Sequence, residues 1–261
     1  MGANGADNTF NQNYFALWGL NHFTLLNQGS EVQLLLDKSS GSGFRSKLVY
    51  GSGLFRIKMK ISDKKTAGIL STLYLTSAPD FKDQKLHDEI DFEFLGTNGT
   101  LQTNVFANDD GHREQKFQLW FDPTKDFHTY EILWNQYQIV FFVDKIPIRV
   151  FKNNTALGVN YPSNPMQIEA SIWKADWAGQ VNWSQAPFIA HYQYFNIDGC
   201  PTQQKSISQQ CYSLQYEWNK REHWELSPVQ KQQYEQVRKA HLVYDYCSDK
   251  SKNHPECPSN K

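Results

Sequence analysis

The 261-residue sequence predicts an all-β fold, an antiparallel sandwich or barrel, followed by a short C-terminal extension. Short β-like runs with alternating apolar residues recur along most of the chain, and turn residues separate them. After Gly199 the composition becomes polar, and all four cysteines lie beyond that point. We therefore expect a β-sandwich at residues 1–199 and a disulfide-tied extension at residues 200–261 that packs on the sandwich.

The strand predictions follow from alternation and from β-branched and aromatic content. The predicted strands are 31–37, 54–62, 72–77, 101–107, 116–121, 128–134 and 137–144. Tight turns are expected at GSG (51–53), NG (98–99), DDG (109–111) and NNT (153–155). In the extension, Ser227 followed by Pro228 is typical of a helix start and predicts a helix over 227–240. LVYDYC at 242–247 then predicts one strand.

The charge balance excludes several classes of partner. Lys and Arg number 26 against 27 Asp and Glu, so no basic field is available for nucleic acid or an anionic membrane. No window approaches the roughly 18 uncharged apolar residues of a membrane span. The first ten residues, MGANGADNTF, lack an apolar segment, so no signal peptide is expected within this chain, and we expect that one was removed.

The cysteines and glycosylation motifs favour secretion. The even number of cysteines allows three disulfide connectivities, of which sequential pairing closes two short loops; the residues are Cys200, Cys211, Cys247 and Cys257. A zinc site is the alternative, but no C-x-x-C or nearby His pair accompanies them, which favours disulfides. N-x-[ST] motifs indicate glycosylation at Asn98, Asn153 and Asn182.

The run HDEIDFEF (87–94) concentrates negative charge in a chain with a net charge of only -1. On a strand, Glu89, Asp91 and Glu93 point to one face and the intervening apolar residues point to the core. Two neighbouring carboxyls cannot both ionise easily, so one pKa rises and an acid and a nucleophile become distinct. Asp91 could hydrogen-bond Glu89 and orient it. The Cα atoms of Glu89 and Glu93 are about 13 Å apart at roughly 3.3 Å per residue, which leaves retaining and inverting glycosidase geometries both open.

Two other interpretations of this run stay open at this point. The acids could form a solvated face paired with neighbouring cations, or a Ca²⁺ or Mg²⁺ site, although no spacing typical of such a loop accompanies them. Aromatic residues favour the glycosidase, because three tryptophans in the polar stretch 171–183 suit stacking on sugars; they are Trp173, Trp177 and Trp183. Core packing at the sandwich edge is the alternative for each.

Several of these runs resemble plant xyloglucan endotransglucosylase/hydrolases of glycoside hydrolase family sixteen. The likeness extends from Tyr14 to Cys257, includes the extension, and is carried by HDEIDFEFLG (87–96), QTNVF (102–106), REQKFQLWFDPTKDFHTYEILWN (113–135), VDKIPIRVFKN (143–153), NYPSNPMQIEASIW (160–173) and VRKAHLVYDYC (237–247). The resemblance implies a β-jelly-roll sandwich, concanavalin A-like, with an open cleft and a retaining mechanism on a β-1,4-glucan backbone.

The resemblance also implies residue roles. Glu89 matches the nucleophile, Asp91 its helper and Glu93 the general acid/base. Residues that match sugar-binding positions of the cleft are Gln102, Asn104, Arg113 and Glu114, and those that match positions lining the glucan subsites are Tyr74, Trp173 and Trp177. The mechanism needs only carboxyls and an acceptor hydroxyl, so no cofactor and no metal are expected.

The sequence departs from the family pattern in four places. The stretch 97–101 is shortened, and so is the loop AGQVNW after Trp177. Asp176-Trp177 lacks one acidic residue of the usual doubled pair, and EASIW (169–173) replaces a more usual Tyr-Ser-Ser run. Both loops border the acceptor side. Because an extended loop there accompanies enzymes that favour water, the shortened loop favours transfer over hydrolysis.

We therefore expect a secreted endotransglucosylase of the plant cell wall that acts on xyloglucan as a monomer, with a polysaccharide donor and an oligo- or polysaccharide acceptor. The alternatives are a mainly hydrolytic xyloglucanase or mixed-linkage β-glucan endoglucanase and, more remotely, a non-catalytic glucan-binding lectin. A lectin is expected to have lost one of the two glutamates, and both are present here.

Overall fold

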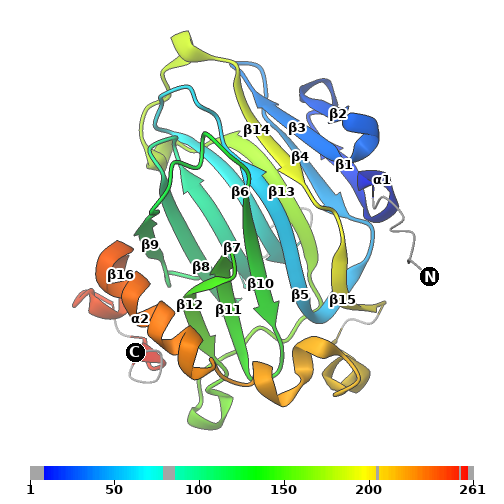
Figure 1. The fold of residues 1–261 in the computed structure, drawn as a ribbon, viewed down its shortest axis with the longest axis vertical. Coiled ribbons are helices and arrows are strands. Elements are labelled where there is room, and N and C mark those ends of the chain that lie inside the picture. The colour runs from blue at the N-terminus through cyan, green and yellow to red at the C-terminus, as the bar shows by residue number, and fades with distance from the viewer. Residues whose placement is uncertain (1–8, 79–85, 204–205, 253, 258–261) are drawn as a thin grey trace.

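A computed structural model describes residues 9–78, 86–203, 206–252 and 254–257. Two large antiparallel sheets pack face to face and enclose one hydrophobic core (Figure 1). Alternation along the strands turns apolar side chains inward from both sheets, as expected for a sandwich. The prediction of an all-β jelly-roll sandwich is confirmed.

The first sheet, called sheet A, carries the acidic run. Its strands, in spatial order, are β1 (Tyr14–Trp18), β4 (Ser42–Ser46), β13 (Gln167–Lys174), β6 (Ile69–Thr76), β7 (His87–Leu95), β8 (Thr100–Asp109), β9 (Gln115–Gln118) and β16 (Leu242–Asp245). The last strand comes from the predicted extension, so the extension is continuous with sheet A.

The second sheet, sheet B, lies nearer the viewer in Figure 1. Its strands, in spatial order, are β12 (Ile146–Lys152), β11 (Gln138–Val143), β10 (His128–Trp134), β5 (Val49–Lys60), β14 (Phe188–Gln193), β3 (Glu31–Leu36) and β2 (Phe23–Leu26), and β15 (Ile197–Thr202) also pairs with β5.

Helix α2 (Pro228–His241) begins where the sequence predicted it. The Ser227 hydroxyl accepts a hydrogen bond from the Gln230 backbone N–H, and the Gln230 side chain accepts one from the Ser227 N–H, which completes a capping box. The other helical segments are short: α1 (Phe10–Asn13) and the 3₁₀ turns Leu20–His22, Asn27–Gly29, Thr155–Leu157, Asp176–Ala178, Trp183–Gln185, Gln209–Tyr212, Glu217–Asn219, Arg221–His223 and Tyr246–Ser248. Among the described helices, none is long and apolar enough to cross a membrane.

Aromatic packing fixes which face of β7 is buried. The Phe92 ring meets the rings of Tyr130 and Phe141 on sheet B edge to face, with centroids 5.6 and 5.1 Å apart. Such pairs contribute about 0.5–1.5 kcal/mol each beyond the burial of their area. A slip of one residue would expose Phe92 and bury its acidic neighbours, so this packing specifies the register.

Two local predictions differ from the structure. The GSG segment 51–53 is not a turn, because β5 runs through it. A Cβ at Gly51 would lie 2.8 Å from the Ile207 side chain, and a Cβ at Gly53 would lie 2.4 Å from the Phe55 ring, so these glycines permit close packing. Strand β9 is also shorter than expected, since it ends at Gln118.

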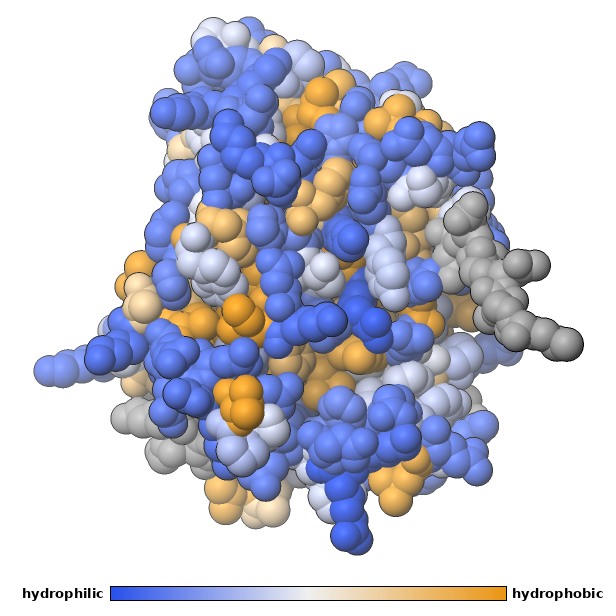
Figure 2. Space-filling model, in the orientation of Figure 1, coloured by the Kyte–Doolittle hydropathy of each residue, from blue (hydrophilic) through white to orange (hydrophobic). Residues whose placement is uncertain are grey.

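The extension packs on the outer face of sheet B as well as on the edge of sheet A. Trp218 and Leu226 cover Leu133 and Val140, which point away from the sandwich core and are nevertheless buried. Figure 2 shows this side of the molecule as mainly hydrophilic, with hydrophobic side chains in small patches.

Candidate active site

The three acids of β7 lie on the outer face of sheet A, flanked by β6 and β8. Asp91 is opposite Tyr74 on β6 and Asn104 on β8. Glu93 is opposite Thr72 and Gln102 in the same way. Directly opposite residues of an antiparallel sheet share a face, so polar and aromatic side chains surround the acids.

Asp91 is the most buried of the three acids, with 5% of its surface exposed. Burial raises the pKa of Asp91 well above its usual range, and the charges of Glu89 and Glu93 and a hydrogen bond with Glu89 raise it further. The Arg149 guanidinium opposes this rise. A protonated Asp91 has a hydrogen to donate to Glu89, so it can hold the Glu89 carboxylate in one orientation.

Glu93 is tuned toward neutral pH. Burial raises the pKa of Glu93 to about 7, with further contributions from the charges of Glu89 and Glu114. Gln102 acts in the other direction, because its Nε2 donates to Glu93 Oε2 at 2.6 Å. A carboxyl that keeps its proton up to this pH is suited to general acid catalysis.

The acids form the middle of a groove. A hollow of about 400 Å³ on one side is lined by Trp18, Thr72, Tyr74, Ser171 and Trp173, and one of about 360 Å³ on the other by Gln102, Asn104, Phe106, Glu114, Lys116, Trp177 and Tyr244. Glu89, Asp91 and Glu93 line both. Since the two hollows are similar in volume, a chain could extend past the acids in both directions.

Most of the predicted sugar-binding residues lie in this groove. Tyr74 and Trp173 line the first hollow, and the predicted residues in the second are Gln102, Asn104, Glu114 and Trp177. Trp177 is 60% exposed, which suits a stacking surface. Trp183 lies elsewhere, because it packs against the hydrophobic core near Phe188.

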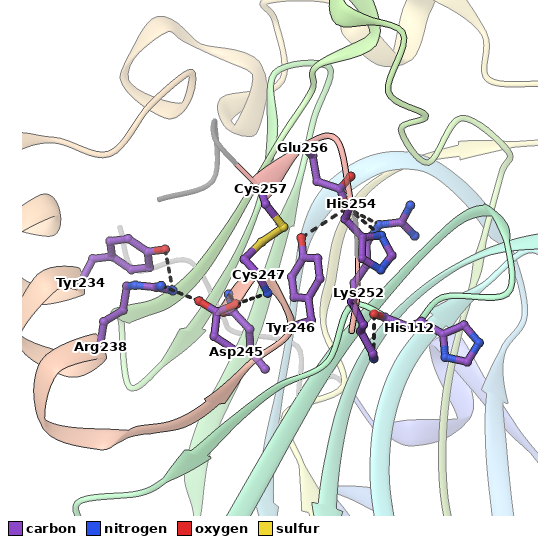
Figure 3. Close-up of a disulfide and its surroundings, with 12 residues drawn as sticks. His112, Tyr234, Arg238, Asp245, Tyr246, Cys247, Lys252, His254, Glu256 and Cys257 are labelled. Carbon is purple, nitrogen blue, oxygen red and sulfur yellow. Dashed lines mark hydrogen bonds and ion pairs between the residues drawn. A yellow bond between two sulfur atoms is a disulfide. The ribbon is translucent and has the colours of Figure 1, made fainter. Parts of the chain in front are cut away.

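Arg113 is placed differently from the expectation, because it does not line either hollow. Its guanidinium is buried, with Nε 2.5 Å from Glu256 Oε1 and an Nη atom 2.8 Å from Asp109 Oδ2. Figure 3 shows Glu256 beside the Cys247–Cys257 disulfide, together with Tyr246 and His254. Arg113 therefore ties the C-terminal loop to β8, behind the groove wall.

Sequence reasoning missed several lining residues. Three of them lie two residues from a predicted site residue and so point to the same face of the sheet: Thr72 beside Tyr74, Ser171 beside Trp173 and Lys116 beside Glu114. The alternation of side chains could therefore have identified them. Trp18 and Tyr244 come from the first and last strands of sheet A, and nothing in the sequence placed those edges over the groove.

His87 and Asp88, which adjoin the acids, have different surroundings. His87 Nε2 lies 3.5 Å from Glu89 Oε2, and its ring stacks on Phe106. The Asp88 carboxylate is fully buried and accepts hydrogen bonds from the backbone N–H groups of Asn108, Ser163 and Asn164. Asp88 thus joins β7 to the end of β8 and to the loop that contains Ser163 and Asn164, rather than facing the groove.

A metal site on β7 gains no support from the geometry. Within the described residues, the His, Cys, Asp and Glu side chains gathered closely enough to share one ion are Glu217, Glu222 and His223. That group is mostly exposed and lies on the extension, outside the groove lining. Exposed acidic clusters are common without an ion, so it receives no assignment.

The cysteines and the asparagines of the glycosylation motifs do not line either hollow. Disulfides join Cys200 to Cys211 and Cys247 to Cys257, the sequential pairing. Asn98 and Asn182 are exposed, and glycosylation there stays a prediction. Asn153 is half-buried, and its Nδ2 donates to the Gln136 carbonyl at 2.8 Å, which makes it the least accessible of the three.

Comparison with known proteins places the chain in a family. Residues 10–195 match glycosyl hydrolases family 16, and residues 213–259 match the xyloglucan endo-transglycosylase (XET) C-terminus. The chain is 50% identical over 272 residues to the putative xyloglucan endotransglucosylase/hydrolase protein 1 of Arabidopsis thaliana, covering 98% of this chain and 90% of that protein. It is also 51% identical over 255 residues to xyloglucan endotransglucosylase/hydrolase protein 3 of Arabidopsis thaliana, covering 94% of this chain and 86% of that protein.

Solved structures agree with this placement. A β-glucanase of Bacillus licheniformis superimposes with a TM-score of 0.60 at 27% identity, covering 69% of this chain and 89% of that one. A prokaryotic β-1,3-1,4-glucanase (lichenase) derived from a mouse hindgut metagenome gives a TM-score of 0.59 at 25% identity, covering 77% and 90%. The chain therefore belongs to glycosyl hydrolases family 16 and, within that family, to the xyloglucan endotransglucosylase/hydrolases.

Proposed function

We propose that this enzyme is a secreted, retaining endotransglucosylase that cleaves xyloglucan in the plant cell wall and transfers the new chain end to a glucan acceptor. The observation that carries the proposal is the pairing of Glu89 with Glu93 in the middle of a groove open on both sides. Burial raises the pKa of Glu93 to about 7, so its carboxyl stays protonated at the pH where glycoside cleavage requires an acid.

The chemistry balances without a cofactor. Glu89 attacks the anomeric carbon and forms an ester with the donor chain, while Glu93 gives its proton to the glycosidic oxygen of the leaving chain. The ionised Glu93 then takes the proton of an acceptor 4-hydroxyl, whose oxygen displaces Glu89 from the anomeric carbon. One β-1,4 bond replaces another, and both glutamates return to their starting states.

The position of Glu93 suggests how the chains are oriented. Gln102 on β8 holds the Glu93 carboxyl by a hydrogen bond, so the proton is delivered on the β8 side. We therefore assign the leaving chain and the acceptor to the hollow with Asn104, Glu114 and Trp177, and the donor to the hollow with Tyr74 and Trp173. Arg113 is assigned a supporting role behind the acceptor hollow in place of direct sugar contact.

Transfer competes with hydrolysis, because water can take the place of the acceptor hydroxyl. The groove is open on both sides of the acids, so a mainly hydrolytic xyloglucanase or a mixed-linkage endoglucanase is the second candidate. The shortened loops at 97–101 and after Trp177 favour transfer. The apoplastic location, the monomeric state, the three glycosylation sites and the division at residue 199 stay predictions.

The test is incubation of the enzyme and xyloglucan with labelled xyloglucan oligosaccharides. We expect label to enter the polymer. A rise in reducing ends without incorporation of label would instead identify the enzyme as mainly a hydrolase. Glu89→Ala should abolish both outcomes, whereas Glu235→Ala, on the exposed side of α2, should leave both unchanged. Full activity in the Glu89→Ala variant would refute the catalytic assignment and leave the lectin as the remaining interpretation.

A further inference from the structure

A row of polar side chains crosses sheet A toward the catalytic strand. Arg45 on β4 is opposite Glu169 on β13, Glu169 is opposite Tyr74 on β6, and Tyr74 is opposite Asp91 on β7. Directly opposite positions share one face of a sheet, so the row lies on the groove side. It adds a fourth carboxylate, Glu169, to the neighbourhood of the three acids.

Glu169 is held by two donors. Arg45 Nε donates to Glu169 Oε1 at 2.7 Å, and the Tyr74 hydroxyl donates to Glu169 Oε2 at 2.6 Å. Arg45 is 7% exposed and Glu169 only 1%. A buried carboxylate is costly unless an opposite charge and hydrogen bonds compensate it, and here each oxygen has its own donor.

The row is within the electrostatic reach of the nucleophile. Burial raises the pKa of Tyr74 well above its usual range, and the charges of Glu169, Glu89 and Asp91 add to that rise. Burial also raises the pKa of Glu169; Tyr74 and Arg45 lower it, and the charge of Glu89 raises it again. Glu169 and Glu89 therefore interact although they stand on different strands.

We propose that Glu169 is a positioning residue of this active site, which holds the Tyr74 hydroxyl in one orientation, and that Arg45 cancels the Glu169 charge at the catalytic strand. Because the Tyr74 hydroxyl donates its hydrogen bond to Glu169, its oxygen can only accept a hydrogen bond from a sugar hydroxyl of the donor chain. The inference rests on the proposed function for the roles of Glu89 and Glu93.

Other charges face the acids, and they do not depend on this row. Glu93 faces Glu89 on its own strand and Glu114 and Lys116 on the β9 side. Asp91 faces Glu89 and Glu93, and Arg149 approaches it from sheet B. Since substitutions at Arg45 and Glu169 leave all of these groups in place, a shift in the titration of Glu93 reports the row alone.

The decisive variant is Glu169→Gln, because the guanidinium of Arg45 stays charged at every working pH and is then unbalanced. We expect the titration of Glu93, followed by ¹³C NMR of its carboxyl, to move to lower pH. Three strand spacings separate Arg45 from β7, so its charge lies about 15 Å from Glu93. At an effective dielectric constant near 20 the shift is then somewhat under one pH unit. The double variant Arg45→Gln, Glu169→Gln should return the titration to its wild-type position.

Two further variants separate charge from geometry. Glu169→Asp keeps the charge and withdraws the carboxylate from Tyr74, so the Glu93 titration should stay in place while kcat/KM falls about tenfold to a hundredfold. Glu31→Gln is the matched control, because Glu31 is a buried carboxylate held by His191 and Gln193 on sheet B. It should change neither quantity.

The inference is overturned if Glu169→Gln leaves the Glu93 titration unmoved, or if the double variant does not restore it. Should Glu169→Gln fail to fold, Glu169→Asp decides, and an unchanged kcat/KM for that variant removes the positioning role. The NMR titration needs no substrate. A wild-type protein without activity on glucans would therefore refute the proposed function. The charge balance between Arg45 and Glu169 would still be tested by the NMR titration of Glu93.

Discussion

Among single residues, Glu93 shows how burial prepares a carboxyl for the acid role that we propose. Its pKa is raised to about 7, so the carboxyl is protonated below that pH and ionised above it. If Glu93 acts as general acid, kcat/KM should decline as pH rises through about 7. Above that pH it should fall about tenfold per pH unit, as expected for the loss of one proton. A pH series with a labelled acceptor measures the decline, and a profile that stays flat to pH 9 would contradict the assignment.

The same raised pKa has a consequence for stability. Between its usual value of 4.5 and about 7, Glu93 binds more protons in the folded than in the unfolded state. The free energy of unfolding therefore falls as pH rises through this window. Glu93→Gln cannot ionise and keeps the Gln102 contact, so at pH 8 it should raise the free energy of unfolding by on the order of 1 kcal/mol, while activity falls about 10²-fold or more.

Urea unfolding at two pH values checks this prediction. At pH 4 the wild-type carboxyl is protonated in both states, so the gain should disappear there. A variant that is less stable than wild type at pH 8 would show that Glu93 is not destabilising when ionised.

How far the sequence predicted the site depends on how regular the backbone is. Alternation along β7 placed Glu89, Asp91 and Glu93 on one face because that stretch is an unbroken strand. Alternation did not apply to Arg113, since Gly111 and His112 before it have φ values of 77° and 64° and the chain reverses there. Glu169 does alternate with Trp173, but a pattern cannot reveal that it is paired with Arg45 far away in the sequence.

At the scale of elements, local signals predicted the helix and most strands, and tertiary packing decided the rest. Ser227 and Pro228 specify the start of α2 through contacts within the first turn, so the sequence suffices. The GSG segment has the composition of a turn, yet β5 continues through it because its neighbours press against the backbone there. No local pattern contains that information.

Gly53→Ala tests this explanation. A Cβ at Gly53 would lie 2.4 Å from the Phe55 ring and 2.7 Å from the Asp198 carbonyl oxygen. Since the carbonyl belongs to the paired strand β15 and cannot move freely, overpacking should lower the free energy of unfolding by about 1–3 kcal/mol. Urea unfolding measures the loss. Val229→Ala, at a side chain that is 65% exposed, is the control and should stay within about 0.5 kcal/mol of wild type.

At the scale of the whole molecule, the C-terminal residues contribute to the candidate active site as well as to the sandwich. β16 pairs with β9 and brings Tyr244 to the acceptor hollow. Lys252 Nζ lies 2.6 Å from Glu114 Oε2, which lines the same hollow (Figure 3 shows Lys252). The wall over which we place the acceptor is therefore assembled from the middle of the sequence and from its C-terminal extension, and no single run predicts it.

The two disulfides allow the contribution of the C-terminal extension to the acceptor hollow to be measured, because they close loops of nearly equal length. Their sequence separations are 11 and 10 residues, so replacing either pair by serine should cost a similar free energy, about 2–4 kcal/mol. Their surroundings differ. Cys200 and Cys211 pack beside Trp218 on the outer face of sheet B, whereas the Cys247–Cys257 loop supplies Lys252 to Glu114 and Glu256 to Arg113.

We therefore expect the Cys247→Ser, Cys257→Ser variant to raise the KM for the acceptor several-fold and to leave the KM for the donor unchanged. The Cys200→Ser, Cys211→Ser variant is the matched control, because it should lose comparable stability and keep both KM values. Both are assayed well below their unfolding temperatures, so that folded protein is compared with folded protein. Equal acceptor KM values in the two variants would mean that the C-terminal loop stabilises the fold without shaping the acceptor hollow.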